Sequence, residues 1–330
     1  MQGYEPPYAS TEKMLELVSS IAEKTGRISS HGGLESRPHL RRNNRIRSIH
    51  SSLKIEANSL SLNEVRDVLN GHLVLGDQKE IQEVKNAFAA YEKISEIDPS
   101  SMEHLKELHG IMTHLTVEES GAFRRGEEGV FSGNACIFVA PPPHMVEGLM
   151  QDLLSWVKRS EGKVHPLILS AVFHYEFVFI HPFADGNGRM ARLWHTVILS
   201  RWRSLFRYIP LEPLIERFQK QYYDAIAQCH ANGNSNAFIE FMLKIIDLAL
   251  DDAIAQVDRE CAESSIYVKR LLGVMEYDVP YAAGELMERL GLKSKETLRR
   301  HYLHPAMASG HIRMTLPDTP SSRNQRYVRQ

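Results

Sequence analysis

The stretch HPFADGNGRMAR, from His181 to Arg192, is the part of the sequence from which the fold and the chemistry of the chain are best inferred. Pro182 stops the apolar segment that precedes it, because proline lacks the N–H that continues a helix. Gly186 and Gly188 allow backbone dihedrals and a close ligand approach that a side chain would block. The stretch therefore predicts a tight turn whose backbone N–H groups can face a ligand.

A helix is expected to begin at about Asn187, where apolar residues start to recur at helical spacing. Its N-terminal end carries unpaired amides and partial positive charge, which together favour an anion. Arg189 and Arg192 are three positions apart, hence on one helix face, and each guanidinium matches the geometry of phosphate oxygens. Asp185 can hold Mg²⁺ on bound phosphates, and His181 titrates near neutrality and can accept a proton. The cluster predicts phosphate chemistry.

Every position of this stretch also matches the pattern HPF-x-[DE]-G-N-G-R-x-x-R. It therefore resembles the signature of the Fic (filamentation induced by cAMP) family, in which a protein hydroxyl attacks a nucleotide phosphate. Most of that family transfers AMP, so the resemblance implies a protein adenylyltransferase with ATP as substrate and Mg²⁺ as its ion. It implies these roles: His181 as general base, Asp185 as magnesium ligand, Gly186, Asn187 and Gly188 as an anion nest, and Arg189 and Arg192 as holders of the distal phosphates.

An upstream segment, SSLKIEAN from Ser51 to Asn58, resembles the inhibitory helix of the same family, [ST]-x-x-x-E-[GN]. Ser52 and Glu56 satisfy the spacing, whereas Ala57 departs from the usual Gly or Asn. The resemblance implies that Glu56 pairs with Arg192 and misplaces ATP, as in the N-terminally autoinhibited subclass. Charge supports this, because a carboxylate is the natural substitute for phosphate on an arginine. The alternative is that Glu56 is a solvated surface charge.

Composition sets broad limits on the 330-residue chain, which is 43% apolar and 24% charged with a net charge of −2. These values are typical of a globular protein, without a bulk charge that would attract nucleic acid or an anionic membrane. Cys136, Cys229 and Cys261 have no paired spacing, so we expect neither a disulfide framework nor a zinc site. The first residues do not resemble a signal peptide, and Pro166–Ile180 is too short to span a membrane. We expect a cytoplasmic protein.

The fold class expected is mainly α: a Fic helical core with a β-hairpin flap and a C-terminal winged-helix domain. We expect an N-terminal helical region at 1–99 with the inhibitory helix at about 43–57, a Fic catalytic domain at 100–250 and the winged helix at 251–330. Helical patterns cover Ser10–Lys24, Arg42–Ala57, Ser61–Leu69 with Ser61 as cap, Lys79–Ile97, Met102–Thr113, Val146–Val157, Pro166–Ile180, Gly188–Ser204 and Ala237–Leu250.

Strand-like alternation over Val130–Val139 predicts a hairpin. In the Fic family the matching hairpin is the flap, whose edge aligns the target segment by strand addition; the alternative is a surface hairpin without a function. Tyr222 and Tyr223, together with Asn236–Phe241, resemble positions that flank the family's adenine pocket. Without that resemblance the two tyrosines are simply aromatic residues on a helix face.

After residue 250 the pattern changes to helix, turn, helix and a hairpin, with a turn at Gly291, a second helix at Lys295–Tyr302 and strands at His311–Leu316 and Arg326–Val328. This is typical of a winged helix, which binds DNA or docks on a protein. The basic residues of this region are Lys293, Lys295, Arg299, Arg300, His301, Arg313, Arg323, Arg326 and Arg329.

Two classes of function therefore stay open. The first is an adenylyltransferase that acts on a hydroxyl side chain of a target protein or on itself. The second is a DNA-binding or protein-docking regulator in which the Fic site senses a nucleotide or removes AMP. The sequence leaves open the target protein, other nucleotide or phosphocholine donors, and whether the chain forms a homodimer.

Overall fold

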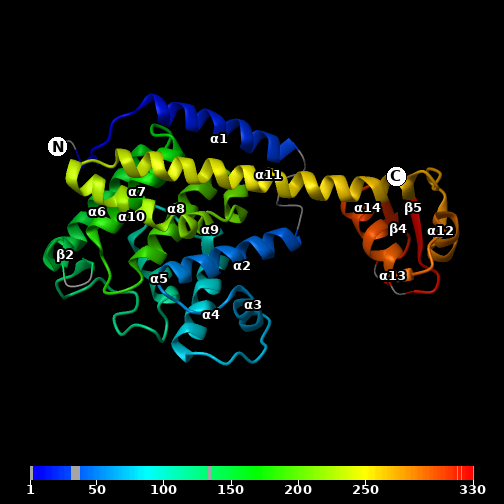
Figure 1. The fold of residues 1–330 in the computed structure, drawn as a ribbon, viewed down its shortest axis with the longest axis horizontal. Coiled ribbons are helices and arrows are strands. Elements are labelled where there is room, and N and C mark those ends of the chain that lie inside the picture. The colour runs from blue at the N-terminus through cyan, green and yellow to red at the C-terminus, as the bar shows by residue number, and fades with distance from the viewer. Residues whose placement is uncertain (1–2, 31–37, 133–134, 318, 321, 330) are drawn as a thin grey trace. The chain divides into compact units, whose positions relative to one another are not determined.

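The computed structural model describes residues 3–30, 38–132, 135–317, 319–320 and 322–329. Helices predominate throughout (Figure 1), so the expected mainly α class is confirmed. The chain divides into two compact units, Met1–Asp252 and Ala253–Gln330. The finer division of the first unit near residue 100 remains our proposal. None of the described helices is both long and apolar enough to cross a membrane.

Two helices form the centre of the first unit: α7 (Pro166–Ile180) and α8 (Asn187–Trp202). Both are buried on nearly every side because other helices surround them, which explains why α7 reads as a continuous apolar run. The rings of Phe173 and Trp194 stack between them with centroids 6.1 Å apart. The turn of the signature joins these two helices, so two buried helices of the core position it.

Other helical elements surround this pair. They are η1 (Lys93–Ser95), α5 (Met102–Met112), α6 (Pro143–Ser160), η2 (Ser204–Tyr208), α9 (Glu212–Arg217), α10 (Gln219–Asn232) and the first part of α11 (Asn236–Leu272). The last helix is longer than the expected Ala237–Leu250 and ends just before Gly273, because no earlier residue breaks it.

Cys229 is buried and free, and the side chains of Cys136 and Cys261 lie outside those described.

The N-terminal region supplies α1 (Glu12–Ser30), α2 (Pro38–Ile55), α3 (Leu62–Leu69) and α4 (Gln78–Glu92). Helix α1 lies along α11 (Figure 1), where Nζ of Lys24 is 2.8 Å from a carboxylate oxygen of Asp247. Ser61 caps α3 as expected, and Glu64 completes the capping box. Helix α2 buries Ile46 and Leu53 in the first unit. The expected inhibitory helix is thus part of the packed core.

The predicted hairpin consists of the antiparallel strands β1 (Gly129–Ser132) and β2 (Ala135–Val139). Residues 133 and 134, at its tip, lie outside the described residues. At its base the ring of Phe138 stacks on His230 of α10, with centroids 4.2 Å apart. This contact ties the end of β2 to the helical core, and the role of the hairpin as a flap stays a prediction.

The second unit contains β3 (Pro280–Ala282), α12 (Ala283–Leu290), a helical run made of α13 (Lys295–Thr297), η3 (Leu298–Leu303) and α14 (His304–Ala308), then β4 (Ile312–Met314) and β5 (Arg326–Arg329). Its antiparallel sheet has the order β3-β5-β4. The sequence pattern missed β3, which is short and starts with a proline. Leu271, Leu286 and Tyr302 are at the centre of its own core. Its assignment as a winged helix remains a prediction.

Candidate functional site

The signature turn begins at the end of α7, where His181 adopts the left-handed conformation with φ 50°. Gly186, at φ 82°, is the N-cap of α8 and needs the positive φ that glycine tolerates. The side chain of Asn187 closes the turn: it accepts a hydrogen bond from the backbone N–H of Phe183 at 2.9 Å and donates one to the carbonyl of Phe183 at 2.6 Å. Only the backbone of Asn187 is therefore left to serve the expected anion nest.

Arg124 fixes the position of His181, and sequence reasoning missed it. This guanidinium is 3% exposed and donates to four backbone carbonyls. Its Nε lies 2.6 Å from the carbonyl oxygen of His181, and its Nη1 lies 2.9 Å from that of Gly126. Its Nη2 contacts the carbonyls of Pro141 and Ile180. One side chain thus joins the segments on both sides of the hairpin to the start of the signature.

His109 of α5, which sequence reasoning also missed, supports the turn by a ring contact and a hydrogen bond. Its ring stacks on Phe183 with centroids 3.6 Å apart. Its Nδ1 accepts a hydrogen bond of 2.9 Å from the backbone N–H of Gly121, so the ring proton is assigned to Nε2. Nε2 donates a hydrogen bond of 3.0 Å to the carbonyl of Asp185. Burial lowers the pKa of His109 to about 4, so the ring is neutral at pH 7. A single buried histidine has no motif, so only the fold could reveal this role.

Glu56 and Arg192, far apart in sequence, form an ion pair in the structure. Oε1 of Glu56 lies 2.7 Å from Nη2 of Arg192. Arg192 also donates from Nε to Oγ of Ser52 at 3.1 Å and from Nη2 to the carbonyl of Ser52 at 2.9 Å. Burial by itself would lower the pKa of Arg192, but the Glu56 carboxylate together with Tyr222 and Tyr91 raises it above the ordinary value. The arginine is therefore fully charged, and the end of α2 holds it on three atoms.

The Glu56 carboxylate also lies directly against the start of α8. A Cβ atom added to Gly188, the second residue of that helix, would collide with Oε1 of Glu56. The carboxylate can approach the helix so closely only because position 188 has no side chain. An anion therefore already lies beside Arg192 at the helix N-terminus, where the sequence predicts that phosphate binds.

Arg189, the other signature arginine, is also held by carboxylates. Its Nη2 lies 3.0 Å from Oδ1 of Asp185, and its Nη1 lies 3.4 Å from Oε1 of Glu83 on α4. The side chain of Arg189 is 3% exposed. No sequence pattern indicates the role of Glu83, because it lies on an ordinary helix without a motif. Both arginines are thus paired with acidic side chains in this state.

His181 has the properties that a proton acceptor needs. Its side chain is partly buried, and burial lowers its pKa from the ordinary value. Its Nδ1 lies 3.4 Å from the carbonyl oxygen of Val178. A proton on Nδ1 that points at this oxygen leaves the lone pair on Nε2. The imidazole is therefore neutral near pH 7 and able to accept a proton.

The two tyrosines of α10 differ sharply in their surroundings. Tyr222 is 2% exposed, and its hydroxyl lies 2.9 Å from Nε2 of the buried His174. Its ring packs edge-on against Phe238. Tyr223 is 47% exposed. A flat contact of adenine with Tyr222 would require this core to open, so Tyr223 is the better candidate for the expected contact, which stays a prediction.

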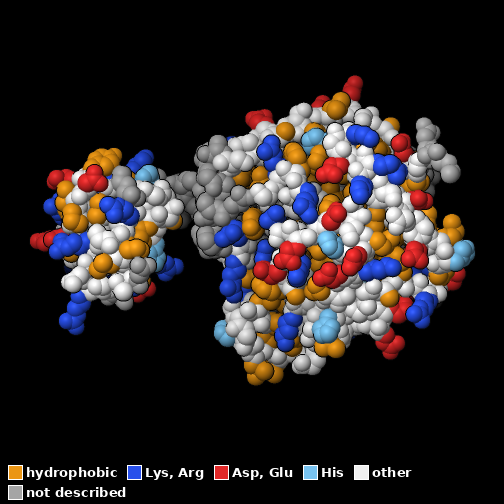
Figure 2. All heavy atoms as spheres, turned by 180° about the vertical axis from the view of Figure 1, so that it is seen from behind, with side chains coloured by type: hydrophobic (Ala, Val, Ile, Leu, Met, Phe, Trp, Pro, Cys, Tyr) orange, Lys and Arg blue, Asp and Glu red, His pale blue; other side chains and the backbone are white. Residues whose placement is uncertain are grey.

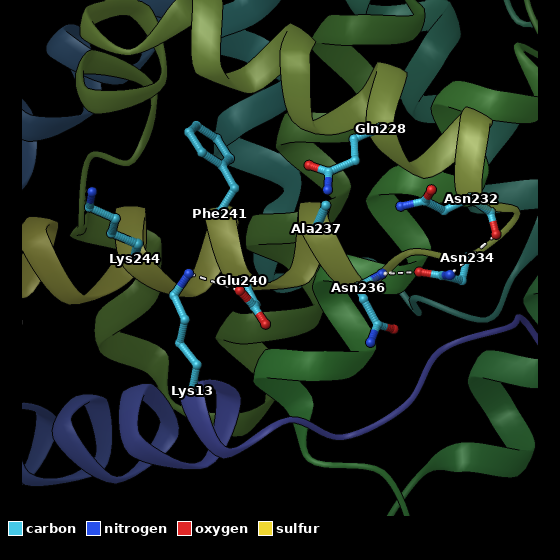
Figure 3. A pocket seen from close by; sticks show the side chains of 9 residues that line it. All are labelled: Lys13, Gln228, Asn232, Asn234, Asn236, Ala237, Glu240, Phe241 and Lys244. Atoms are coloured by element: carbon cyan, nitrogen blue, oxygen red, sulfur yellow. Dashed lines mark hydrogen bonds and ion pairs between the residues drawn. The ribbon is translucent and has the colours of Figure 1, made fainter.

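Four residues of the segment Asn236–Phe241 line a surface pocket of about 370 Å³ between α10, α11 and the start of α1 (Figure 3), namely Asn236, Ala237, Glu240 and Phe241. Lys13 of α1 closes one side by its ion pair with Glu240, at 2.8 Å. Side-chain amides of Gln228 and Asn232 face the same space. No signature residue lines this pocket, so it is separate from the anion position beside Arg192.

The fold and the site together define a class of protein: mainly helical, with a buried helix whose N-terminus lies beside two arginines and a neutral histidine. Residues 99–199 match the profile of the Fic/DOC family. Residues 267–328 match that of the C-terminal domain of the Fic-like, filamentation induced by cAMP proteins. The crystal structure of a Fic family protein from Desulfovibrio desulfuricans G20 is similar to this chain, with a TM-score of 0.75. The two sequences are 41% identical, and the match covers 99% of this chain and 98% of that protein's chain.

The chain belongs to the Fic/DOC family. It is also similar to proteins named protein adenylyltransferase Fic. The one from Aedes aegypti is 29% identical over 62% of this chain and 41% of its own length. The one from Drosophila mojavensis is 28% identical over 71% of this chain and 46% of its own length. The chain thus spans less than half the length of these relatives.

Proposed function

We propose that this protein is an adenylyltransferase that transfers AMP from ATP to a hydroxyl side chain of a target protein or of itself, and that Glu56 restrains it by pairing with Arg192. The carboxylate of Glu56 against Gly188 and Arg192 is the observation that carries the proposal. An arginine fork beside a helix N-terminus binds phosphate oxygens as well as a carboxylate. The name of the Aedes aegypti and Drosophila mojavensis relatives supports the same reaction.

In this reaction His181 accepts the proton of the target hydroxyl, whose oxygen then attacks the α-phosphorus of ATP. A bond forms between that oxygen and phosphorus, the bond to the β-phosphate oxygen breaks, and pyrophosphate leaves. Arg189 and Arg192 hold the distal phosphates, so the site works mainly by position and charge. The lowered pKa of His181 keeps the acceptor unprotonated near neutral pH.

Asp185 is the residue that would hold Mg²⁺. Its side chain is 46% exposed. No group of three or more His, Cys, Asp and Glu side chains in the described part of the chain could hold a metal by itself. A single accessible carboxylate fits Mg²⁺, which takes its remaining ligands from phosphates and water. The ion would neutralise phosphate charge, while Asp185 fixes its place next to Arg189.

Restraint by Glu56 follows from competition for one guanidinium. Arg192 is buried, with 1% of its side chain exposed, so it cannot turn away to serve a second anion elsewhere. A phosphate must therefore replace the Glu56 carboxylate or bind in a displaced position. The α-phosphorus of ATP bound in that way is misplaced relative to His181 and the target hydroxyl, so transfer is slow.

The test is the intact mass of the protein after incubation with ATP and Mg²⁺. Glu56→Gly should gain the mass of AMP much faster than the parent. Glu56→Gly combined with His181→Ala should gain none, which separates enzymatic transfer from chemical labelling. Equal labelling of the parent and Glu56→Gly would contradict the restraint, and no labelling of either, with added candidate targets present, would contradict the transferase. Release of AMP from a modified protein would favour the alternative that the site removes AMP.

We further propose a docking role for Ala253–Gln330, with DNA as the first partner to test. Lys293, Lys295, Arg299 and Arg300 are all exposed on or beside the run from α13 to η3. Figure 2 displays basic side chains on the drawn face of this smaller unit. Arg329, in contrast, donates to backbone carbonyls within the unit and is structural.

DNA binding would weaken steeply as salt increases, because phosphate contacts release counterions. Arg299→Ala combined with Arg300→Ala should weaken binding and make the dependence on salt shallower. Binding that is insensitive to salt and to both changes would favour a protein partner instead.

A further inference from the structure

The side chain of Glu83 joins two parts of the site that no motif connects. Glu83 lies on α4 and is 13% exposed. Its Oε1 is 3.4 Å from Nη1 of Arg189. Its Oε2 accepts a hydrogen bond of 2.9 Å from Nδ2 of Asn58. One carboxylate therefore contacts a signature arginine and the segment that directly follows the Glu56 helix.

Asn58 determines how the chain leaves α2. The residue before it, Ala57, has φ 67°, a left-handed conformation that terminates the helix. Asn58 is buried, and its amide nitrogen also donates to the carbonyl of Glu80 at 3.3 Å. Its Oδ1 accepts the backbone N–H of Leu60 at 3.2 Å. Since Glu56 is two residues earlier, these contacts restrict the movement of its carboxylate.

Arg189 depends on Glu83 for its orientation. The guanidinium has Asp185 on one side and Glu83 on the other. Its Nε is buried and has no hydrogen-bond partner among the described residues. Without Glu83, Asp185 would be the only described residue that holds this guanidinium, and Asp185 is itself half-exposed. A loosely held arginine binds phosphate less well because its orientation must be fixed on binding.

We propose that Glu83 is a positioning residue that couples the phosphate site to the inhibitory helix. It orients Arg189 for the distal phosphates of ATP, and through Asn58 it keeps Glu56 in place on Arg192. The inference rests on the proposed transferase function and extends it, because it assigns regulation to a residue outside both motifs. Binding of ATP at Arg189 and release of Glu56 from Arg192 are then linked events.

The two contacts can be tested separately. Glu83→Gln replaces one of the two carboxylate oxygens by an NH₂ group, so a donor faces the N–H group of either Arg189 or Asn58 and one of the two contacts is lost. Asn58→Asp keeps the acceptor for Leu60 but sets a second carboxylate against Glu83. The matched control is Glu92→Gln, which removes the same charge from the same helix and breaks the ion pair of Glu92 with Arg45 of α2.

In the Glu56→Gly background, Glu83→Gln should raise KM for ATP by about tenfold with little change in kcat, as expected for the loss of one charge-assisted hydrogen bond. With Glu56 present, Asn58→Asp should raise the basal rate by about threefold to tenfold, less than Glu56→Gly does, because the arginine pair can still form. Glu92→Gln should change neither value.

Hydrogen exchange of the amides at 56–58 supplies a readout that does not require activity. Asn58→Asp and Glu83→Gln should speed this exchange, and Glu92→Gln should not. An unchanged KM for Glu83→Gln, or unchanged exchange for Asn58→Asp, overturns the coupling. If Glu56→Gly shows no transfer, the proposed function fails, but the exchange measurement still decides whether Glu83 restrains the helix. If Glu83→Gln does not fold, Asn58→Asp alone decides.

Discussion

Oε1 of Glu56 lies 2.7 Å from Nη2 of Arg192, although the two residues are 136 positions apart in the sequence. The carboxylate comes from the turn directly after α2, and the guanidinium comes from α8, a buried helix of the core. This pair connects the regulatory and the catalytic hypotheses, since one buried arginine serves both. Most of the following predictions alter this pair or the turn beside it.

Removal of the carboxylate should activate the protein. We expect Glu56→Gly to raise adenylylation by about one to two orders of magnitude, since a charge-assisted pair contributes roughly 1.5–3 kcal/mol. Arg192→Ala should not activate, and the double change should be inactive, because the phosphate contact is also lost. Lys54→Ala, which removes an exposed charge from the same turn, is the control. Initial rates with labelled ATP compare the four variants with the parent, and an unchanged rate for Glu56→Gly would refute the restraint.

Gly188→Ala should have opposite effects in two backgrounds. In the parent, the new Cβ collides with the end of the flexible Glu56 side chain, so the carboxylate must shift on Arg192 at a cost of about 1 kcal/mol of unfolding free energy. In Glu56→Gly the collision is absent, and alanine in a helix is better than glycine by up to about 1 kcal/mol. Urea unfolding of the four proteins forms a double-mutant cycle. The same effect in both backgrounds would mean that the carboxylate does not rest on Gly188.

Substitutions of His181 and of Asp185 should impair different steps: transfer in the first case and ATP binding in the second. His181→Ala should abolish transfer and leave the dissociation constant for ATP nearly unchanged, because the base acts on the target hydroxyl. Asp185→Ala should weaken ATP binding in the presence of Mg²⁺ and have little effect when EDTA is present. Calorimetric titration with ATP compares the variants in the Glu56→Gly background. Residual transfer at the parental rate by His181→Ala would show that another group accepts the proton.

Stability should depend on pH through His109. Its folded pKa of about 4 lies below the ordinary value of 6.5, so the neutral form stabilises the fold above pH 6.5, and this contribution is lost as pH falls toward 4. Between pH 7 and pH 5 the loss is about 2 kcal/mol. His109→Asn should therefore destabilise the protein less at pH 5 than at pH 7. Parallel free-energy curves for the parent and this variant across that range would contradict the assignment.

The unit Ala253–Gln330 should be dispensable for chemistry. It has its own core, centred on Leu271, Leu286 and Tyr302, so its removal leaves the core around α7 and α8 intact. A chain that ends at Asp252 and carries Glu56→Gly should fold cooperatively and keep its transfer rate within about threefold, the spread expected for a distant change. Circular dichroism and the labelling assay check this. Aggregation or loss of activity would mean that the second unit completes the catalytic one.

The sequence predicted the helices well where local signals were strong. Pro166–Ile180 matches α7 at both ends because a proline begins it and His181 with Pro182 ends it. The weakest assignment was α11, which continues to Leu272, since no residue within it signals an end. The strand β3 was missed because three residues cannot display a period of two.

The sequence by itself determined the chemistry that a contiguous motif can encode: the turn between α7 and α8, its glycines, the histidine and the two arginines. Resemblance to a known motif also predicted the partner of Arg192. Only the tertiary structure decided which distant groups complete the site. Arg124, His109 and Glu83 reach the turn from three other segments. Local sequence specifies backbone conformation through neighbouring residues, whereas burial and long-range hydrogen bonds depend on how separate helices pack.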